Sequence, residues 1–180
     1  MPQMTDDLEA LPFWAQVLIA SRLTRRSTHG LDVLTPQKDR DTLIAGCDAM
    51  DRCACAGSWS AAERDVILRA KNLSISGPAQ KTLLAMYYAA DATHAANDTM
   101  DFGAADAACM ASVRKSISFA SQSRGLNPLQ AAIAVAGDMD IIAFACKEAS
   151  IGRYDGLGEG VMSRIHPVHP PESWRGAPGV

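Results

Sequence analysis

Three long segments repeat apolar residues with the period of an α-helix, and they limit the fold more than any other feature of the chain. They are Ala79–Ala96, Ala104–Ser123 and Pro128–Ile151. The last is the best delimited, because Asn127 can cap its first turn, Pro128 suits the first helical position and Gly152 can end it.

Apolar side chains lie on two neighbouring sides of Pro128–Ile151. One stripe comprises Ala132, Val135, Ala136, Met139, Ile142, Cys146 and Ala149. The second comprises Leu129, Ile133, Gly137 and Phe144. Since a helix that is apolar on more than one side is normally buried among others, we expect this helix at the centre of the fold. The residues expected to be almost wholly buried are Ala132, Val135, Met139, Ile142 and Cys146, together with Leu83, Val113 and Ile117.

Similar signals delimit three earlier helices, so that six helices account for most of the 180 residues. The predicted helices are 12–27, 36–55, 61–73, 78–97, 102–123 and 128–151, and Gly160–Ile165 is a candidate for one further turn. Ser60 and Glu63 have the spacing of a capping box at the third helix. No stretch has the alternating pattern of a strand. We therefore predict an all-α fold, in which residues 1–180 form a single-domain antiparallel helical bundle with an irregular, extended Pro-rich tail over residues 166–180.

Composition argues against several classes of function. The net charge is −3, and neither half of the chain has the basic surplus typical of nucleic-acid binders. Met1–Ala10 is acidic and lacks the basic start and apolar core of a secretory signal. Asp138 and Asp140 interrupt the best candidate for a membrane span, which needs about 18 apolar residues. Five cysteines, an odd number, argue against a disulfide framework, so we expect a cytoplasmic protein without nucleic-acid or membrane partners.

The first helix ends in three arginines, Arg22, Arg25 and Arg26. Positive charge suits the C-terminal end of a helix, where the backbone dipole is negative. We interpret the cluster as a solvated helix end that complements this dipole, and a site for an anion or an acidic partner is the alternative.

Tyr87, Asp91 and His94 form the group whose spacing most suggests chemistry. Separations of four and three residues place all three on one side of their helix. Asp91 could orient His94, as carboxylates do for general bases and for metal-bound histidines. Because this side also carries Leu83, we expect His94 to be partly or fully buried. The alternative is a core polar network with ordinary hydrogen bonds, since no second [DE]-x-x-H completes a metal site of the kind found in bundles.

Asp138 and Asp140 point about 160° apart on a helix, so they cannot form a paired carboxylate site. At least one of them must approach the interior and find a donor there, because an unpaired buried carboxylate is too unfavourable. We interpret it as one partner of a structural ion pair, with a functional carboxylate as the alternative. The candidate donors are Arg114, Arg124 and His94. The same two interpretations, a structural ion pair and a functional carboxylate, apply to Asp106.

Cys47, Cys53 and Cys55 have the composition of a metal cluster but not its spacing. A continuous helix points Cys53 and Cys55 about 160° apart, whereas zinc sites normally use C-x₂₋₄-C. These residues are more typical of small core side chains, and no metal or cofactor is expected there. Gly156–Gly160 is not a dinucleotide-binding loop either, because no strand precedes it.

The tail contains His166 and His169 among four prolines, which hold a chain extended. We expect it to pack Trp174 and its proline rings over an apolar groove rather than to bind a metal.

Two functional hypotheses follow. The first is a protein-interaction module that binds a partner chain or a second copy of itself. It depends on the near-neutral charge, the absence of a catalytic motif and the abundance of Ala and Met, which favour close helix packing. The second is an enzyme or a small-ligand or metal-binding bundle. In it Asp91 orients His94, His94 acts as base or metal ligand, and Tyr87 hydrogen-bonds the ligand.

Overall fold

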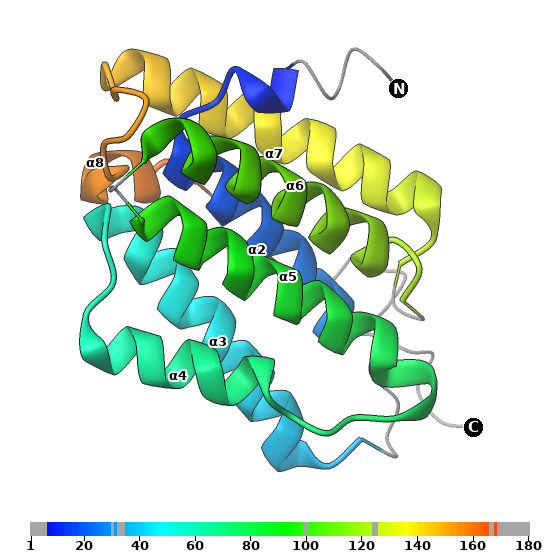
Figure 1. Ribbon diagram of the computed structural model, residues 1–180. Coiled ribbons are helices and arrows are strands. Elements are labelled where there is room, and N and C mark those ends of the chain that lie inside the picture. Colours follow the sequence, from blue (N-terminus) through cyan, green and yellow to red (C-terminus); the bar gives the residue numbers. More distant parts are fainter. Residues whose placement is uncertain are drawn as a thin grey trace.

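Six long helices form where periodicity and capping signals place them (Figure 1). The computed structural model describes residues 7–29, 31, 35–98, 101–123, 126–165 and 168. The long helices are α2 (Phe13–His29), α3 (Gln37–Ala56), α4 (Ala61–Lys71), α5 (Gln80–Asn97), α6 (Phe102–Ala120) and α7 (Pro128–Glu148). The short ones are η1 (Gly77–Ala79) and α8 (Gly158–Met162). Within these ranges there is no strand, and the predicted all-α bundle is confirmed.

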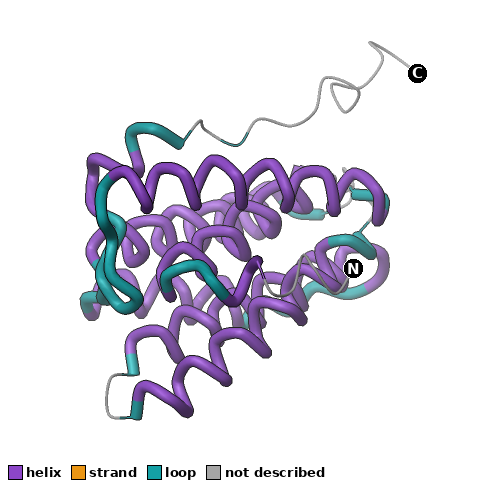
Figure 2. The backbone as a smooth tube through the Cα atoms, turned by 90° about the horizontal axis from the view of Figure 1, so that it is seen from above, coloured by secondary structure: helices purple, strands orange, loops and turns teal. Residues whose placement is uncertain are grey.

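The centre of the bundle is α2, not α7. α2 packs against α3, α5, α6 and α7, and all of its residues except Arg25, Arg26 and His29 are buried. α7 packs on α2 and α8 and runs along one edge of the molecule (Figure 2). The expectation that Pro128–Ile151 lies at the centre is therefore wrong.

α2 can be central because several of its polar side chains have hydrogen-bond partners inside the core. Gln16 Nε2 donates to the carbonyl oxygen of Leu11 at 3.0 Å. Ser21 Oγ donates to the carbonyl oxygen of Cys47 at 3.2 Å, and the hydroxyls of Thr24 and Ser116 lie 3.3 Å apart. A buried polar group with a hydrogen bond carries little penalty, so these residues do not keep α2 at the surface.

α5 and α6 form an antiparallel pair that uses small residues to come close together. The buried side of α5 includes Ala85, Ala89, Ala92 and Ala96. Leu83 and Ile117, which were expected in the core, are only half-buried. Alanine allows closer approach of two helix backbones than leucine does, so the small residues face inward and the larger ones lie at the border.

The predicted helix starts at 61, 102 and 128 are confirmed, and the other three helices begin one or two residues later than predicted. Ser60 and Glu63 form a capping box at α4, and Asn127 forms a second one with Gln130 at α7. Several helix ends come earlier than predicted, α4 at 71, α6 at 120 and α7 at 148. α7 ends through Ser150, whose φ of 54° is left-handed, and Ile151 N–H then bonds the carbonyl of Cys146 at 3.0 Å.

The segment after α7 closes the bundle through two glycines. Gly57, at φ 73°, ends α3, and its backbone lies against that of Gly156. A Cβ on Gly156 would lie 2.4 Å from the Gly57 nitrogen, so only glycine fits there. Leu157 N–H then bonds the carbonyl of Ala54 at 2.9 Å and leads into α8. The tail beyond 165 lies outside the described residues apart from 168, and the expected packing of Trp174 stays a prediction.

Candidate functional site

The structure does not bring Tyr87, Asp91 and His94 together as a site. His94 is exposed, and its ring packs edge to face with the Trp59 ring, with 5.2 Å between centroids. Asp91 pairs with Lys71 Nζ at 2.5 Å, and the same Lys71 Nζ lies 4.2 Å from the centroid of the Tyr87 ring. The expectation that His94 is buried with Asp91 orienting it is therefore wrong.

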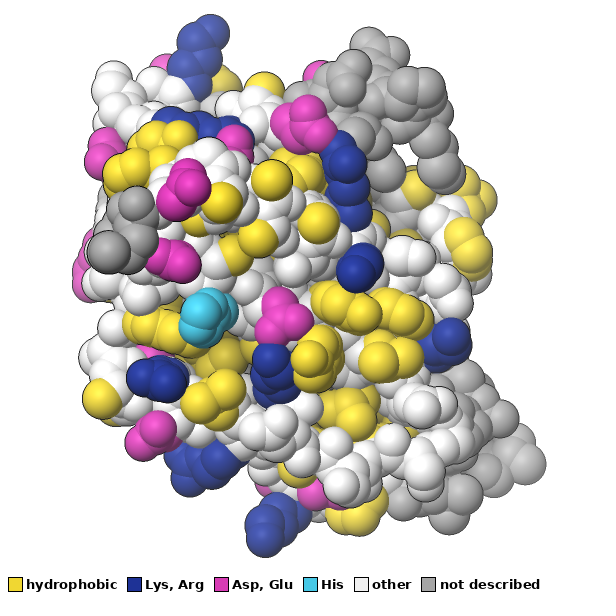
Figure 3. All heavy atoms as spheres, viewed as in Figure 1, with side chains coloured by type: hydrophobic (Ala, Val, Ile, Leu, Met, Phe, Trp, Pro, Cys, Tyr) yellow, Lys and Arg dark blue, Asp and Glu magenta, His cyan; other side chains and the backbone are white. Residues whose placement is uncertain are grey.

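The rotation of α5 explains this outcome. Its inward side follows the alanines that pack on α6, so the side with Tyr87 and His94 turns toward solvent. Figure 3 shows that face, where apolar, basic and acidic side chains interleave around α5 and a histidine lies at the surface. This face carries the partly buried Lys71–Asp91 ion pair and the ring contacts of Tyr87 and His94.

Asp138 is the buried carboxylate that the sequence predicted, with different partners. Its side chain is 4% exposed and accepts hydrogen bonds from Arg22 and Arg26 of α2. The Arg22 Nη2–Asp138 Oδ1 and Arg26 Nη2–Asp138 Oδ1 distances are both 2.9 Å. Burial by itself raises the pKa of Asp138, but hydrogen bonds and charge from the two arginines outweigh it and lower the pKa below 3.8.

The three arginines of α2 thus form ion pairs with aspartates of other helices in the same chain. The predicted solvated helix end is wrong. Arg25, the third member, pairs with Asp48 and Asp51 of α3, each at 2.7 Å. Arg114, expected as a partner for Asp138, instead pairs with Glu9. Asp140 is exposed, as its opposite direction from Asp138 requires.

The cysteines have the character of core residues. Cys47, Cys53, Cys109 and Cys146 are buried and Cys55 is half-buried, all as free thiols. Burial raises the pKa of Cys47, Cys53 and Cys109 to about 12 in each case. A thiol with so high a pKa is a poor nucleophile and a poor metal ligand at neutral pH. In the described ranges, no group of three His, Cys, Asp or Glu side chains is placed to hold a metal ion.

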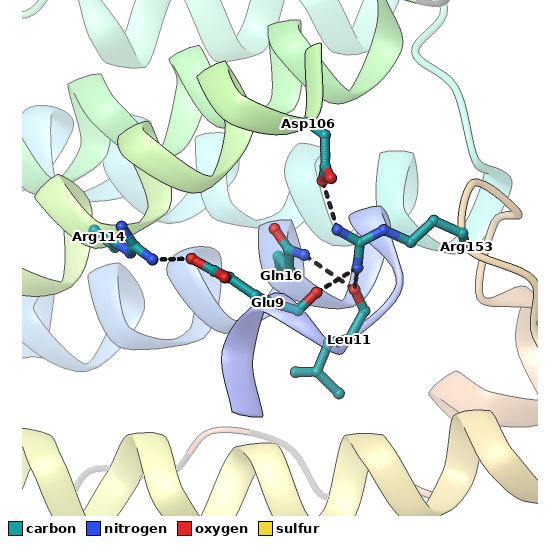
Figure 4. A network of polar contacts seen from close by, with 6 residues as sticks. All are labelled: Glu9, Leu11, Gln16, Asp106, Arg114 and Arg153. Atoms are coloured by element: carbon teal, nitrogen blue, oxygen red, sulfur yellow. Dashed lines mark hydrogen bonds and ion pairs between the residues drawn. The ribbon is translucent and has the colours of Figure 1, made fainter. Parts of the chain in front are cut away.

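A second polar network joins the segment before α2 to the loop after α7 and to α6 (Figure 4). Arg153, after α7, donates to the carbonyl oxygens of Glu9 and Leu11 and to Asp106 Oδ1, the last at 2.6 Å. Gln16 shares the carbonyl of Leu11, so that carbonyl accepts from two side chains. These contacts hold the turn before α2 against α6. The network therefore has a structural role within the fold.

Of the large apolar side chains in the described ranges, the three most exposed lie on one side of α7, and Ile141 lies there with them. Leu129 is 70% exposed, Ile133 and Phe144 are each 64% exposed, and Ile141 is 40% exposed. Gly137, at the middle of this side, is exposed too. We call Leu129, Ile133, Gly137, Ile141 and Phe144 the α7 face. The opposite side of the helix, with Val135, Met139, Ile142 and Cys146, is buried as predicted, whereas Ala132, which was expected to be almost wholly buried, is half-buried.

Two grooves lie along α7, and the second is lined in part by residues of the α7 face. One groove of about 920 Å³ separates α7 from the turn before α2, and its lining includes Leu11, Pro12 and Met139. The other, of about 540 Å³, is lined by Asp140, Ile141, Phe144, Ala145 and Arg164. Grooves next to exposed apolar side chains can receive the side chains of another helix.

By length and composition α7 also qualifies as a candidate membrane span. An 18-residue window within it has a mean hydropathy of 1.6, although 39% of that window is buried in the bundle. Core helices of soluble proteins meet the same criterion, so the length and hydropathy of α7 do not by themselves indicate that it spans a membrane.

Comparison of the chain with protein-family models, with curated protein sequences and with solved structures gives no match.

Sequence reasoning recognised most of the α7 face as a stripe but placed it in the core, and it left out Ile141. The useful signal was that α7 is apolar on two sides while only one can face α2. A helix of this kind is either central or carries an interface, and the number of other helices able to surround it decides between the two.

Proposed function

We propose that the chain is a protein-interaction module and that the α7 face is its contact surface. One observation carries this proposal: four large apolar side chains are 40–70% exposed on one side of a single helix. Contiguous exposed apolar surface of this kind is typical of binding surfaces in folded proteins. Aromatic side chains such as Phe144 often form the anchors of interfaces.

A protein surface suits the α7 face better than a lipid bilayer does. Asp140 is exposed beside Gly137, and a carboxylate is expensive to place in hydrocarbon. At the edge of a protein interface the same carboxylate can stay in water. The five free thiols support a reducing compartment, the cytoplasm, as the place where the module acts.

The alternative of an enzyme or ligand-binding site at Tyr87, Asp91 and His94 has less support. Asp91 forms an ion pair with Lys71, and His94 faces solvent beside Trp59. No observation in the described residues favours it over the α7 face.

Site-specific photo-crosslinking in the cells that express the protein tests the proposal. Phe144 is replaced by p-benzoylphenylalanine, which has a similar shape and reacts with C–H groups in contact with it. The matched control is the same replacement at Phe102 on α6, which is 43% exposed. We expect a discrete protein adduct from position 144 and none from position 102.

The mass of the adduct identifies the partner. Absence of a protein adduct from position 144 and from the corresponding replacement at Ile133 would show that no chain covers the α7 face. Adducts with lipid alone would reassign the face to a membrane, and in either case the proposal fails.

A further inference from the structure

We infer that the α7 face binds a second copy of this chain, with the two α7 helices antiparallel and Gly137 at the two-fold axis. The inference rests on the proposed function and names the partner and the geometry. Two observations support it: the surroundings of Gly137 and the spacing of the apolar side chains around it.

Gly137 has no explanation within one molecule. It lies in the interior of a 21-residue helix, where glycine is about 1 kcal/mol less favourable than alanine. A Cβ built on Gly137 meets no atom within 4 Å, so nothing in this copy excludes a side chain there. A glycine on an exposed helix surface allows the backbone of another helix to approach closely.

The apolar side chains are distributed almost symmetrically about Gly137. Ile133 and Ile141 lie four residues before and after it, and Leu129 and Phe144 lie eight before and seven after. In a two-fold symmetric interface the same patch meets itself, so residues at equal distances before and after the axis lie level with each other. Each Phe144 then lies beside Leu129 and Ile133 of the other copy, and each Gly137 faces the other.

The size and charge of the patch predict a weak dimer. A helix of 21 residues is about 32 Å long and about 10 Å wide. The area that one face of such a helix can bury is therefore smaller than the roughly 800 Å² per partner of a standard interface. Asp140 lies on the same edge in both copies, near the axis, where the two carboxylates repel each other. We therefore expect a dissociation constant of roughly tens of micromolar, at the weak end for protein interfaces.

Sedimentation velocity on the purified full chain, from about 5 to about 500 µM, brackets such an affinity. The decisive variant is Gly137→Gln. A side chain at the axis should weaken the dimer about tenfold or more, because inserted volume disrupts a packed contact. The same change should raise the urea midpoint of the dilute monomer, since glutamine favours a helix more than glycine does.

The matched control is Ala108→Gln on the exposed side of α6, which should leave dimerisation unchanged. A second variant, Phe144→Lys, should abolish the dimer while the helical circular dichroism is retained. Asp140→Asn should tighten the dimer, because it removes the repulsion at the axis.

Each contrary outcome has a distinct meaning. A chain that stays monomeric at the highest concentration while position 144 still crosslinks to a different protein overturns the second-copy partner and leaves the interaction module intact. A dimer that is unaffected by Gly137→Gln overturns the geometry. If removal of residues 166–180 is needed before a dimer forms, that segment covers the α7 face and the inference is wrong.

Discussion

At the scale of single residues, Asp138 determines which side of α7 faces the bundle. It is the only acidic residue in the buried part of α7, and Arg22 and Arg26 hold it against α2. On a helical wheel Phe144 and Ile133 lie about 120–140° away from Asp138, so the ion pair that draws Asp138 inward turns them outward. The buried polar contact and the exposed apolar face are thus two consequences of one rotation of the helix.

Replacing Asp138 with Asn should destabilise the fold by about 3–5 kcal/mol at neutral pH, because two arginines keep their positions without a counter-charge. The free energy of unfolding from urea titration measures this. The lowered pKa of Asp138 also has a consequence for pH. A carboxyl whose pKa is lower in the folded state contributes stability above its unfolded pKa and loses it as pH falls through the folded pKa.

The parent chain should therefore lose this contribution below about pH 4, the unfolded range of an Asp side chain. Asp138→Asn should lack that part of the acid dependence. A variant whose unfolding free energy matches the parent at neutral pH would show that the ion pair is not needed for the fold.

At the scale of helices, the sequence predicts positions well and rotations less well. The stripe of α3, Leu43, Cys47, Met50 and Ala54, is buried as its periodicity indicates. α5 is rotated from its predicted setting because alanines occur on several sides, and close packing selected the side with the fewest large residues. The rotation of a helix depends on the helices that pack against it as well as on its own sequence. Local periodicity alone therefore does not predict it.

The central position of α2 was harder still to predict. Its arginines and hydroxyls look like surface residues until their partners are known, and those partners lie far away in sequence. Arg26 meets Asp138, 112 residues later, and Thr24 meets Ser116, 92 residues later. No local signal in the chain links such pairs.

Two isoleucines of α7 test the orientation of that helix. Ile142 is fully buried and Ile133 is 64% exposed. Ile142→Ala should destabilise the monomer by about 2–5 kcal/mol through the cavity it leaves. Ile133→Ala should change stability by no more than about 0.5 kcal/mol, as is usual at the surface.

Both variants are compared by denaturant titration at a protein concentration below the range where association is expected. A loss below about 1 kcal/mol for Ile142→Ala, or equal losses for the two variants, would mean that α7 faces the bundle with a different side.

At the scale of the whole molecule, contacts between the segment before α2 and the loop after α7 close the fold. Arg153 binds the carbonyls of Glu9 and Leu11, which lie 144 and 142 residues earlier, and also Asp106 of α6 (Figure 4). Phe13 N–H bonds the carbonyl of Arg153 at 2.8 Å. The turn before α2 is also one wall of the groove beside α7, so the same contacts that close the fold shape the surroundings of the α7 face.

Arg153→Gln should remove most of this closure, because glutamine cannot reach three acceptors at once. We expect a loss of about 1–3 kcal/mol, typical of hydrogen bonds to a charged group. Hydrogen exchange should accelerate in residues 7–13 and in the first turn of α6, and should stay unchanged in α3 and α4, which Arg153 does not contact. The control is Arg164→Gln, whose exposed pair with Glu148 is 3.8 Å long and should contribute little to stability. Uniform acceleration across all helices would show that Arg153 supports global stability instead of a local closure between the segment before α2 and the loop after α7.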